Sequence, residues 1–336
     1  MNSARNSLAW KAFIIVLLAC CAVTLTNMRA MAQDPTTYTE EQYKAYQDMQ
    51  GEKASAQKIA LAIKFLQAWP KSGLREHVIA QYHGAMAEYQ KAGNWSQIMS
   101  SGEKFLDLVP DDNMSIGLLA EGYQQQKNYR QFVVFGEKIF PRSPNANLAY
   151  ALAKAYLQLG NDAKFIQWGE KTVSMDSDNH EILMALTKSY GMAKRWPEAT
   201  KYANQCLQAL DTVKKPEGAA DAQWTEYVNG SKAQCYAIIG NAFYEQKKLP
   251  PAIQNLEKSL SFYKRNDVAY YFLGMSYWQS NRSGEAMLNF AKAYLLKGQT
   301  ATASKQYLDQ LYKAGNRGSL VGQERIIDLA RKQLGF

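Results

Sequence analysis

Residues 269–298, AYYFLGMSYWQSNRSGEAMLNFAKAYLLKG, contain two amphipathic helical segments with a polar turn between them. Residues three and four apart share one face of a helix. The first segment has its apolar face at Tyr270, Leu273, Gly274 and Tyr277. The second, after the polar stretch 279–284, has its apolar face at Ala286, Phe290 and Ala293. This stretch therefore predicts a helical hairpin.

The spacing Tyr270-x2-Leu273-Gly274-x2-Tyr277, followed by Ala286-x3-Phe290, resembles the signature of the tetratricopeptide repeat (TPR), a helix–turn–helix unit of about 34 residues. One such unit cannot bury its apolar face alone and needs stacked neighbours. The resemblance implies an all-α fold, a right-handed α-solenoid of antiparallel helix hairpins. It also implies that the chain binds a protein or peptide in the concave groove of a TPR-like superhelix.

Two series of positions recur in one register. Aromatic residues in the middle of the first helices are spaced by 34, 33, 34, 53 and 34 residues: Tyr89, Tyr123, Tyr156, Tyr190, Phe243 and Tyr277. Positions in the second helices have the same spacings: Gly102, Gly136, Gly169, Ala203, Leu256 and Phe290. A glycine inside a helix costs about 1 kcal/mol relative to alanine. We therefore expect the three glycines to allow adjacent helices to approach closely beside the aromatic anchor.

The register predicts one TPR-like helical repeat domain over residues 39–336, made of eight hairpins. The terminal hairpins, at about 39–70 and 301–334, lack the full signature, as expected of repeats that need a polar outer face. The 53-residue step contains an insertion at about 212–230, followed by one long helix. This insertion is either a tolerated surface feature or a projecting lip that a partner contacts.

The N-terminal segment Met1–Ala32 has the pattern of a secretory signal peptide. Arg5 and Lys11 precede an apolar run, Ala12–Leu25, that is short for a membrane-spanning helix of about 20 residues. Small residues precede the expected cleavage point after Ala32, and residues 33–38 form a short linker. We therefore expect an exported protein, located in the periplasm or elsewhere in the cell envelope.

Two alternatives for this segment stay open. Leu17-Leu18-Ala19-Cys20 is similar to a bacterial lipoprotein box, in which Cys20 is lipidated after cleavage. The other alternative is an uncleaved membrane anchor. The chain contacts a membrane only in these two cases, and all three interpretations place the folded part outside the cytoplasm.

Only two cysteines, Cys206 and Cys235, follow the signal peptide. The first falls near the end of a predicted second helix, and the other near the start of the next first helix. Because disulfides form in oxidising compartments outside the cytoplasm, one interpretation is a disulfide between them. The other is two small, buried apolar side chains.

The sequence lacks the usual motifs of enzymes and of nucleic-acid-binding proteins. Its three histidines, His77, His83 and His180, are far apart and belong to no metal-binding or nucleophile motif. The net charge is +9, but no run of five to eight Lys or Arg residues marks a nucleic-acid patch. We predict that the chain is not an enzyme and has no cofactor, no metal site and no nucleic-acid partner.

The TPR resemblance places the residues beside the anchors on the inner wall of the array. In the C-terminal half these are apolar and aromatic, and tyrosine and tryptophan are favoured binding anchors. Trp278 is the leading candidate because it lies off the predicted core face of its helix. The predicted peptide-binding groove contains Tyr244, Tyr271, Met275, Trp278, Lys154 and Lys188.

The main functional prediction is a non-enzymatic scaffold or adaptor of the bacterial cell envelope that binds a protein or peptide partner. One alternative is a lipid-anchored envelope assembly factor, tethered at Cys20 and working in outer-membrane protein or polysaccharide export. A second alternative is a carbohydrate-binding module that uses the aromatic wall.

Overall fold

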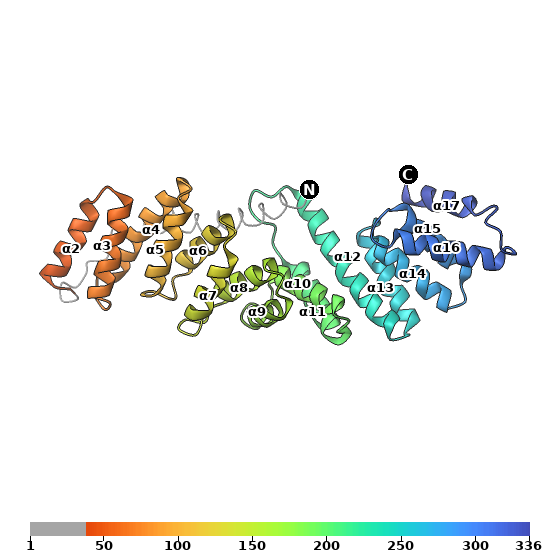
Figure 1. The fold of residues 1–336 in the computed structure, drawn as a ribbon, viewed down its shortest axis with the longest axis horizontal. Coiled ribbons are helices and arrows are strands. Elements are labelled where there is room, and N and C mark those ends of the chain that lie inside the picture. The colour runs from red at the N-terminus through yellow and green to blue at the C-terminus, as the bar shows by residue number, and fades with distance from the viewer. Residues whose placement is uncertain (1–37) are drawn as a thin grey trace. The chain divides into compact units, whose positions relative to one another are not determined.

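The computed structural model describes residues 38–336. The predicted signal peptide Met1–Ala32, the candidate lipidation site Cys20 and residues 33–37 of the predicted linker lie outside the described residues. Over the described range the chain forms α-helices joined by connections, and within each unit most consecutive helices pack against one another (Figure 1). The prediction of an all-α, TPR-like solenoid is confirmed.

The described residues divide into two compact units, with the boundary between Asp176 and Ser177. The described helices of the first unit are α2 (Glu40–Gly51), α3 (Ser55–Ala68), α4 (Arg75–Lys91), α5 (Trp95–Leu106), α6 (Asn113–Gln125), α7 (Tyr129–Ile139), α8 (Ala146–Gln158) and α9 (Asp162–Met175). Those of the second unit are α10 (His180–Met192), α11 (Trp196–Thr212), α12 (Asp221–Glu245), α13 (Leu249–Phe262), α14 (Asp267–Gln279), α15 (Ser283–Leu295), α16 (Ala301–Gly315) and α17 (Glu324–Leu334).

A left-handed residue closes the first helix of each regular hairpin. These residues have φ between 53° and 68° and repeat with the same spacings as the aromatic anchors: Gly93, Lys127, Gly160, Lys194, Lys247 and Asn281. This conformation ends a helix and returns the chain, and glycine and asparagine adopt it most readily. Three lysines occupy it here, so the tight turn is kept even where the residue does not favour it.

Asparagine caps start several of the helices. The side chains of Asn145, Asn161, Asn179 and Asn266 each accept a hydrogen bond from a backbone N–H in the first turn of the helix that follows. Each cap satisfies a donor that the helix itself leaves unpaired. The boundaries of the repeats are thus encoded locally, and the register is set by packing between helices.

In the first unit, glycines in the second helices lie against leucines of the following hairpin. A Cβ added at Gly136 on α7 would lie 2.8 Å from Cδ2 of Leu152 on α8. At Gly102 on α5 it would lie 3.2 Å from Cδ1 of Leu119 on α6. The predicted close approach of helices is therefore present, but the neighbour is a leucine rather than the aromatic anchor.

In the second unit the small residue is on the first helix instead. A Cβ added at Gly240 on α12 would lie 2.7 Å from Cγ of Leu256 on α13. One added at Gly274 on α14 would lie 2.7 Å from Cδ1 of Phe290 on α15. A large residue in one helix thus faces a small residue in its partner in both units, which keeps the packed volume similar.

The anchor tyrosines add a polar contact between successive hairpins. Tyr156 Oη on α8 donates a hydrogen bond of 2.8 Å to Glu137 Oε1 on α7, and Tyr277 Oη on α14 donates one of 2.7 Å to Glu257 Oε1 on α13. Tyr123 and Glu103 make the same pair. Burial raises the pKa of Tyr156 to about 12, and the bond to Glu137 acts in the same direction, so the phenol stays a donor at neutral pH.

Two elements depart from the regular repeat. The predicted insertion is a connection over residues 213–220 followed by α12, which at 25 residues is the longest described helix. At the C-terminus, α17 packs principally on α15, so the last two helices form a less regular pair than the predicted closing hairpin. Ile327 and Ala330 of α17 are buried there, in one apolar cluster with Leu308 and Leu311.

The glycine contacts yield a paired test of the packing. Gly136→Ala should lower the free energy of unfolding by about 1 kcal/mol or more, because the new Cβ overlaps the fully buried Leu152. Gly117 lies in the middle of α6, and no atom lies within 4 Å of a Cβ added there. Gly117→Ala should therefore raise the free energy of unfolding by about 0.5–1 kcal/mol. Denaturant unfolding followed by circular dichroism measures both. Equal stabilisation by the two substitutions would contradict the packing described.

Candidate functional site

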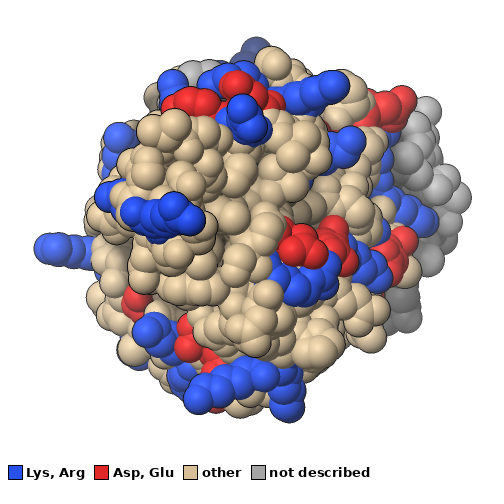
Figure 2. All heavy atoms as spheres, turned by 90° about the vertical axis from the view of Figure 1, so that its right-hand side faces the viewer, with Lys and Arg blue, Asp and Glu red and all other residues tan. Residues whose placement is uncertain are grey.

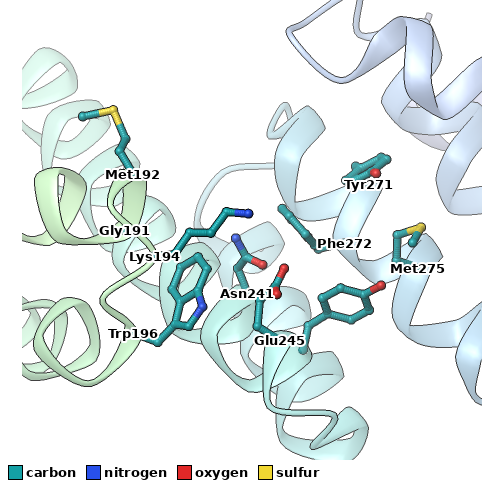
Figure 3. A pocket seen from close by; sticks show the side chains of 10 residues that line it. Gly191, Met192, Lys194, Trp196, Asn241, Glu245, Tyr271, Phe272 and Met275 are labelled. Atoms are coloured by element: carbon teal, nitrogen blue, oxygen red, sulfur yellow. The ribbon is translucent and has the colours of Figure 1, made fainter.

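The second unit contains a pocket of about 440 Å³ between α10, α11, α12 and α14 (Figure 3). Its lining comes from the end of α10, the turn before α11, the last turns of α12 and the middle of α14. The lining residues are Gly191, Met192, Lys194, Trp196, Asn241, Tyr244, Glu245, Tyr271, Phe272 and Met275.

Helical spacing brings the lining side chains together. Asn241, Tyr244 and Glu245 are related by three and four residues on α12, and Tyr271 and Met275 by four residues on α14, so each set shares one face. Gly240 and Gly274, beside these residues, bring α12 and α14 close to their own hairpin partners, α13 and α15. The packing that holds each hairpin together therefore also sets the direction of the pocket residues.

Three polar side chains converge on one side of the pocket. Figure 3 shows Lys194, Asn241 and Glu245 pointing toward one another. The Oδ1 atom of Asn241 is buried and has no hydrogen-bond partner among the described residues. Leaving a buried acceptor unpaired costs about 1–3 kcal/mol. The Asn241 amide thus lies beside a cation and an anion and keeps one acceptor unpaired.

Aromatic rings form the other side. The ring centroids of Tyr271 and Phe272 are 5.1 Å apart, and those of Tyr244 and Phe272 are 5.6 Å apart. Burial raises the pKa of Tyr271 to about 12, with Tyr307 contributing, so this wall is uncharged at neutral pH. The pocket thus combines an apolar wall with a cluster of three polar side chains, of which Lys194 is a cation and Glu245 an anion.

The structure places three of the six predicted groove residues, Tyr244, Tyr271 and Met275, in this pocket. Trp278 is not among its lining residues. It lies on α14 with its ring centroid 5.5 Å from that of Tyr307 on α16, and it is partly buried against the apolar cluster of the second unit.

The two predicted lysines lie elsewhere. Lys154 is on α8 in the first unit, where its Nζ lies 5.5 Å from the ring centroid of Tyr150. Lys188 is on α10, outside the pocket lining, and burial lowers the pKa of its ammonium group.

Sequence reasoning missed Lys194, Trp196, Glu245 and Phe272. Lys194 and Trp196 flank a hairpin turn, which the repeat register treats only as a connection. Lys194 has φ of 55°, and its side chain extends toward Asn241 from this left-handed position (Figure 3). Glu245 could have been found, because it lies four residues after Asn241 on the face that carries Tyr244.

Charge on the surface is mixed. On the face shown in Figure 2, Lys and Arg side chains lie in separate small groups, several of them beside Asp or Glu. Over residues 38–336, no helix is both long and apolar enough to cross a membrane. In the same range no group of three or more His, Cys, Asp or Glu side chains is arranged to hold a metal ion.

No protein-family model and no curated protein matches the sequence. Solved structures with similar folds include MamA (19% identity, TM-score 0.42, covering 55% of this chain and 97% of MamA). They also include PilF of Pseudomonas aeruginosa (18%, 0.38, 70% and 99%) and PilW, described as a type IV pilus biogenesis factor (17%, 0.37, 63% and 94%). These likenesses are too distant to transfer a partner or a location. The repeat register and the helical hairpins themselves make this a TPR-like helical-repeat chain.

Proposed function

We propose that the chain is an adaptor that binds an extended peptide segment of a partner protein in the pocket formed by α10, α11, α12 and α14. The observation that carries the proposal is the buried, unpaired Oδ1 of Asn241, which lies between Lys194 and Glu245. Stacked helical repeats characteristically bind partners on extended surfaces made by neighbouring repeats. The function proposed is recognition, without chemistry on the bound partner.

The polar group matches the chemistry of a peptide main chain. Each peptide unit presents one N–H donor and one C=O acceptor. The amide of Asn241 offers the complementary acceptor and donors at one point. Lys194 and Glu245 add a donor and an acceptor that bind a flanking carbonyl and a flanking N–H. An extended segment satisfies all three side chains at once, because its polar groups are not paired within the segment itself.

The aromatic wall suits a large apolar side chain of that segment. Tyr271, Phe272 and Met275 present rings and a flexible thioether, which gain contact area at low entropic cost. A sugar fits less well, since its many hydroxyls each need a polar partner. Two of the tyrosine hydroxyls are already engaged: Tyr244 Oη accepts a bond of 2.7 Å from Gln279 Nε2, and Tyr271 interacts with Tyr307.

A place in the bacterial cell envelope is part of the proposal and is supported by the N-terminal segment alone. The charged start, the apolar run 12–25 and the cleavage point after Ala32 have the order of a signal peptide. The alternatives are the lipid-anchored assembly factor, attached at Cys20, and an uncleaved anchor.

Asn241→Leu should separate recognition from stability. Leucine has a similar volume but removes the unpaired acceptor, so the free energy of unfolding should stay the same or rise. Binding of peptides selected from a random displayed library should weaken about tenfold or more, because the main-chain hydrogen bonds are lost. Fluorescence anisotropy with labelled peptides measures the affinity.

The control for this test is Asn229→Leu, on the same helix but outside the pocket lining. It should leave the peptide affinity unchanged. Equal affinity for the wild-type chain and the Asn241→Leu variant would refute the pocket as the binding site. Binding of glycans but of no peptide would favour the carbohydrate-binding alternative.

Processing of the N-terminus yields a second test. Mass spectrometry of the chain purified from its native envelope should find Gln33 as the first residue. A mature protein that starts at a lipidated Cys20 would instead support the tethered assembly factor, and an intact Met1 would support the uncleaved anchor.

A further inference from the structure

Two cysteines far apart in sequence meet in the core of the second unit. Cys206 lies on α11 and Cys235 lies on α12, and both are fully buried. Their thiols are free in this structure and interact with one another between the packed helices α11 and α12. They are the only cysteines among the residues the structure describes. Neighbouring helices thus bring together the one pair able to form an intrachain disulfide in that range.

Three helices surround the two cysteines and bury them. The Cys206 thiol also donates a weak hydrogen bond of 3.5 Å to the backbone oxygen of His180, at the start of α10. The ring of His180 lies 5.8 Å from that of Tyr227 on α12. The pair is therefore enclosed by α10, α11 and α12, and the connection 213–220 joins the last two of these helices.

We propose that Cys206 and Cys235 form a disulfide that ties α11 to α12 across this connection. In the reaction two S–H bonds break and one S–S bond forms. The two electrons and two protons pass to an oxidant of the disulfide class, such as oxidised glutathione or a protein disulfide, which is reduced to two thiols. The cross-link is independent of what the pocket binds.

Burial determines when the bond forms. The hydrogen bond to Cys206 and desolvation raise the pKa of the Cys235 thiol, and the ammonium of Lys188 opposes them only in part. A buried, protonated thiol reacts slowly, because thiolate is the attacking species. Oxidation therefore takes place while the chain folds, before α12 packs on α11, and the folded reduced chain resists the same oxidant.

The bond would stabilise the element that presents the pocket. Asn241, Tyr244 and Glu245 lie on α12 after Cys235, and the disulfide would join this helix to α11 across the connection 213–220. A disulfide that closes the segment 206–235 reduces the conformational freedom of the unfolded chain. The oxidised chain should accordingly melt about 5–10 °C above the reduced chain.

The experiment uses residues 33–336, which include every described residue and only these two cysteines. The chain is unfolded, reduced and refolded with a mixture of oxidised and reduced glutathione, and a second sample is refolded with reductant. The expected oxidised product is a monomer with no titratable thiol in denaturant. Its proteolytic digest should contain one peptide pair joined through Cys206 and Cys235, and its melting temperature should be higher. Oxidant added to the folded, reduced chain should react much more slowly.

The variants Cys206→Ala and Cys235→Ala serve as controls and should show no redox-dependent shift in melting temperature. The comparison of oxidised and reduced wild-type chain stands even if a variant folds poorly. The proposal is overturned if the oxidatively refolded chain keeps two thiols, if it links to a second chain instead, or if its melting temperature is not higher than that of the reduced chain.

Discussion

The structure depends on one repeated constraint, a close approach of two helices that leaves no room for a side chain on one of them. At Gly136 the neighbour is Leu152 of the next hairpin, and at Gly274 it is Phe290 of the same hairpin. A hairpin has too little apolar surface to fold alone, so its stability comes from such contacts with its neighbours. The Tyr–Glu hydrogen bonds, such as that from Tyr156 to Glu137, also fix how successive hairpins are aligned. Donor and acceptor come within bonding distance in only one alignment of the two helices.

The same constraint organises the pocket. Gly240 and Gly274 hold one face of α12 and one face of α14 against their partner helices. Asn241, next to Gly240, and Tyr271, three residues before Gly274, are thereby held in the pocket that the turn at Lys194 borders. Packing between the helices fixes these positions with little help from the pocket residues themselves. The pocket tolerates an unpaired amide because its stability is supplied elsewhere, and that unpaired group is what makes the site suited to a ligand.

The fold could be predicted from sequence because the constraint has a period. Aromatic anchors such as Tyr123 and second-helix positions such as Gly136 recur with the same spacings, so they reveal the hairpins without any structure. In three of the second helices the glycine is followed by Glu and Lys, at residues 102–104, 136–138 and 169–171. The glycine indicated a close approach, but the role of the glutamate as the acceptor for the next anchor tyrosine required the geometry.

The site was less predictable, because it depends on which residues meet across hairpins. Tyr244, Tyr271 and Met275 were found from their place in the register. Trp278 has an equivalent place, but Tyr307, from a helix without the repeat signature, lies against it. Lys194 enters the pocket from a turn, and no helical period marks such a position.

The most direct measurement of the central claim is a crystal structure of residues 33–336 with a peptide selected by display. The account predicts an extended peptide in the pocket of the second unit, with a backbone N–H bonded to Asn241 Oδ1 and an apolar side chain against Tyr271 and Phe272. A peptide bound elsewhere on the chain, or bound in the pocket without a hydrogen bond to Asn241, would contradict it.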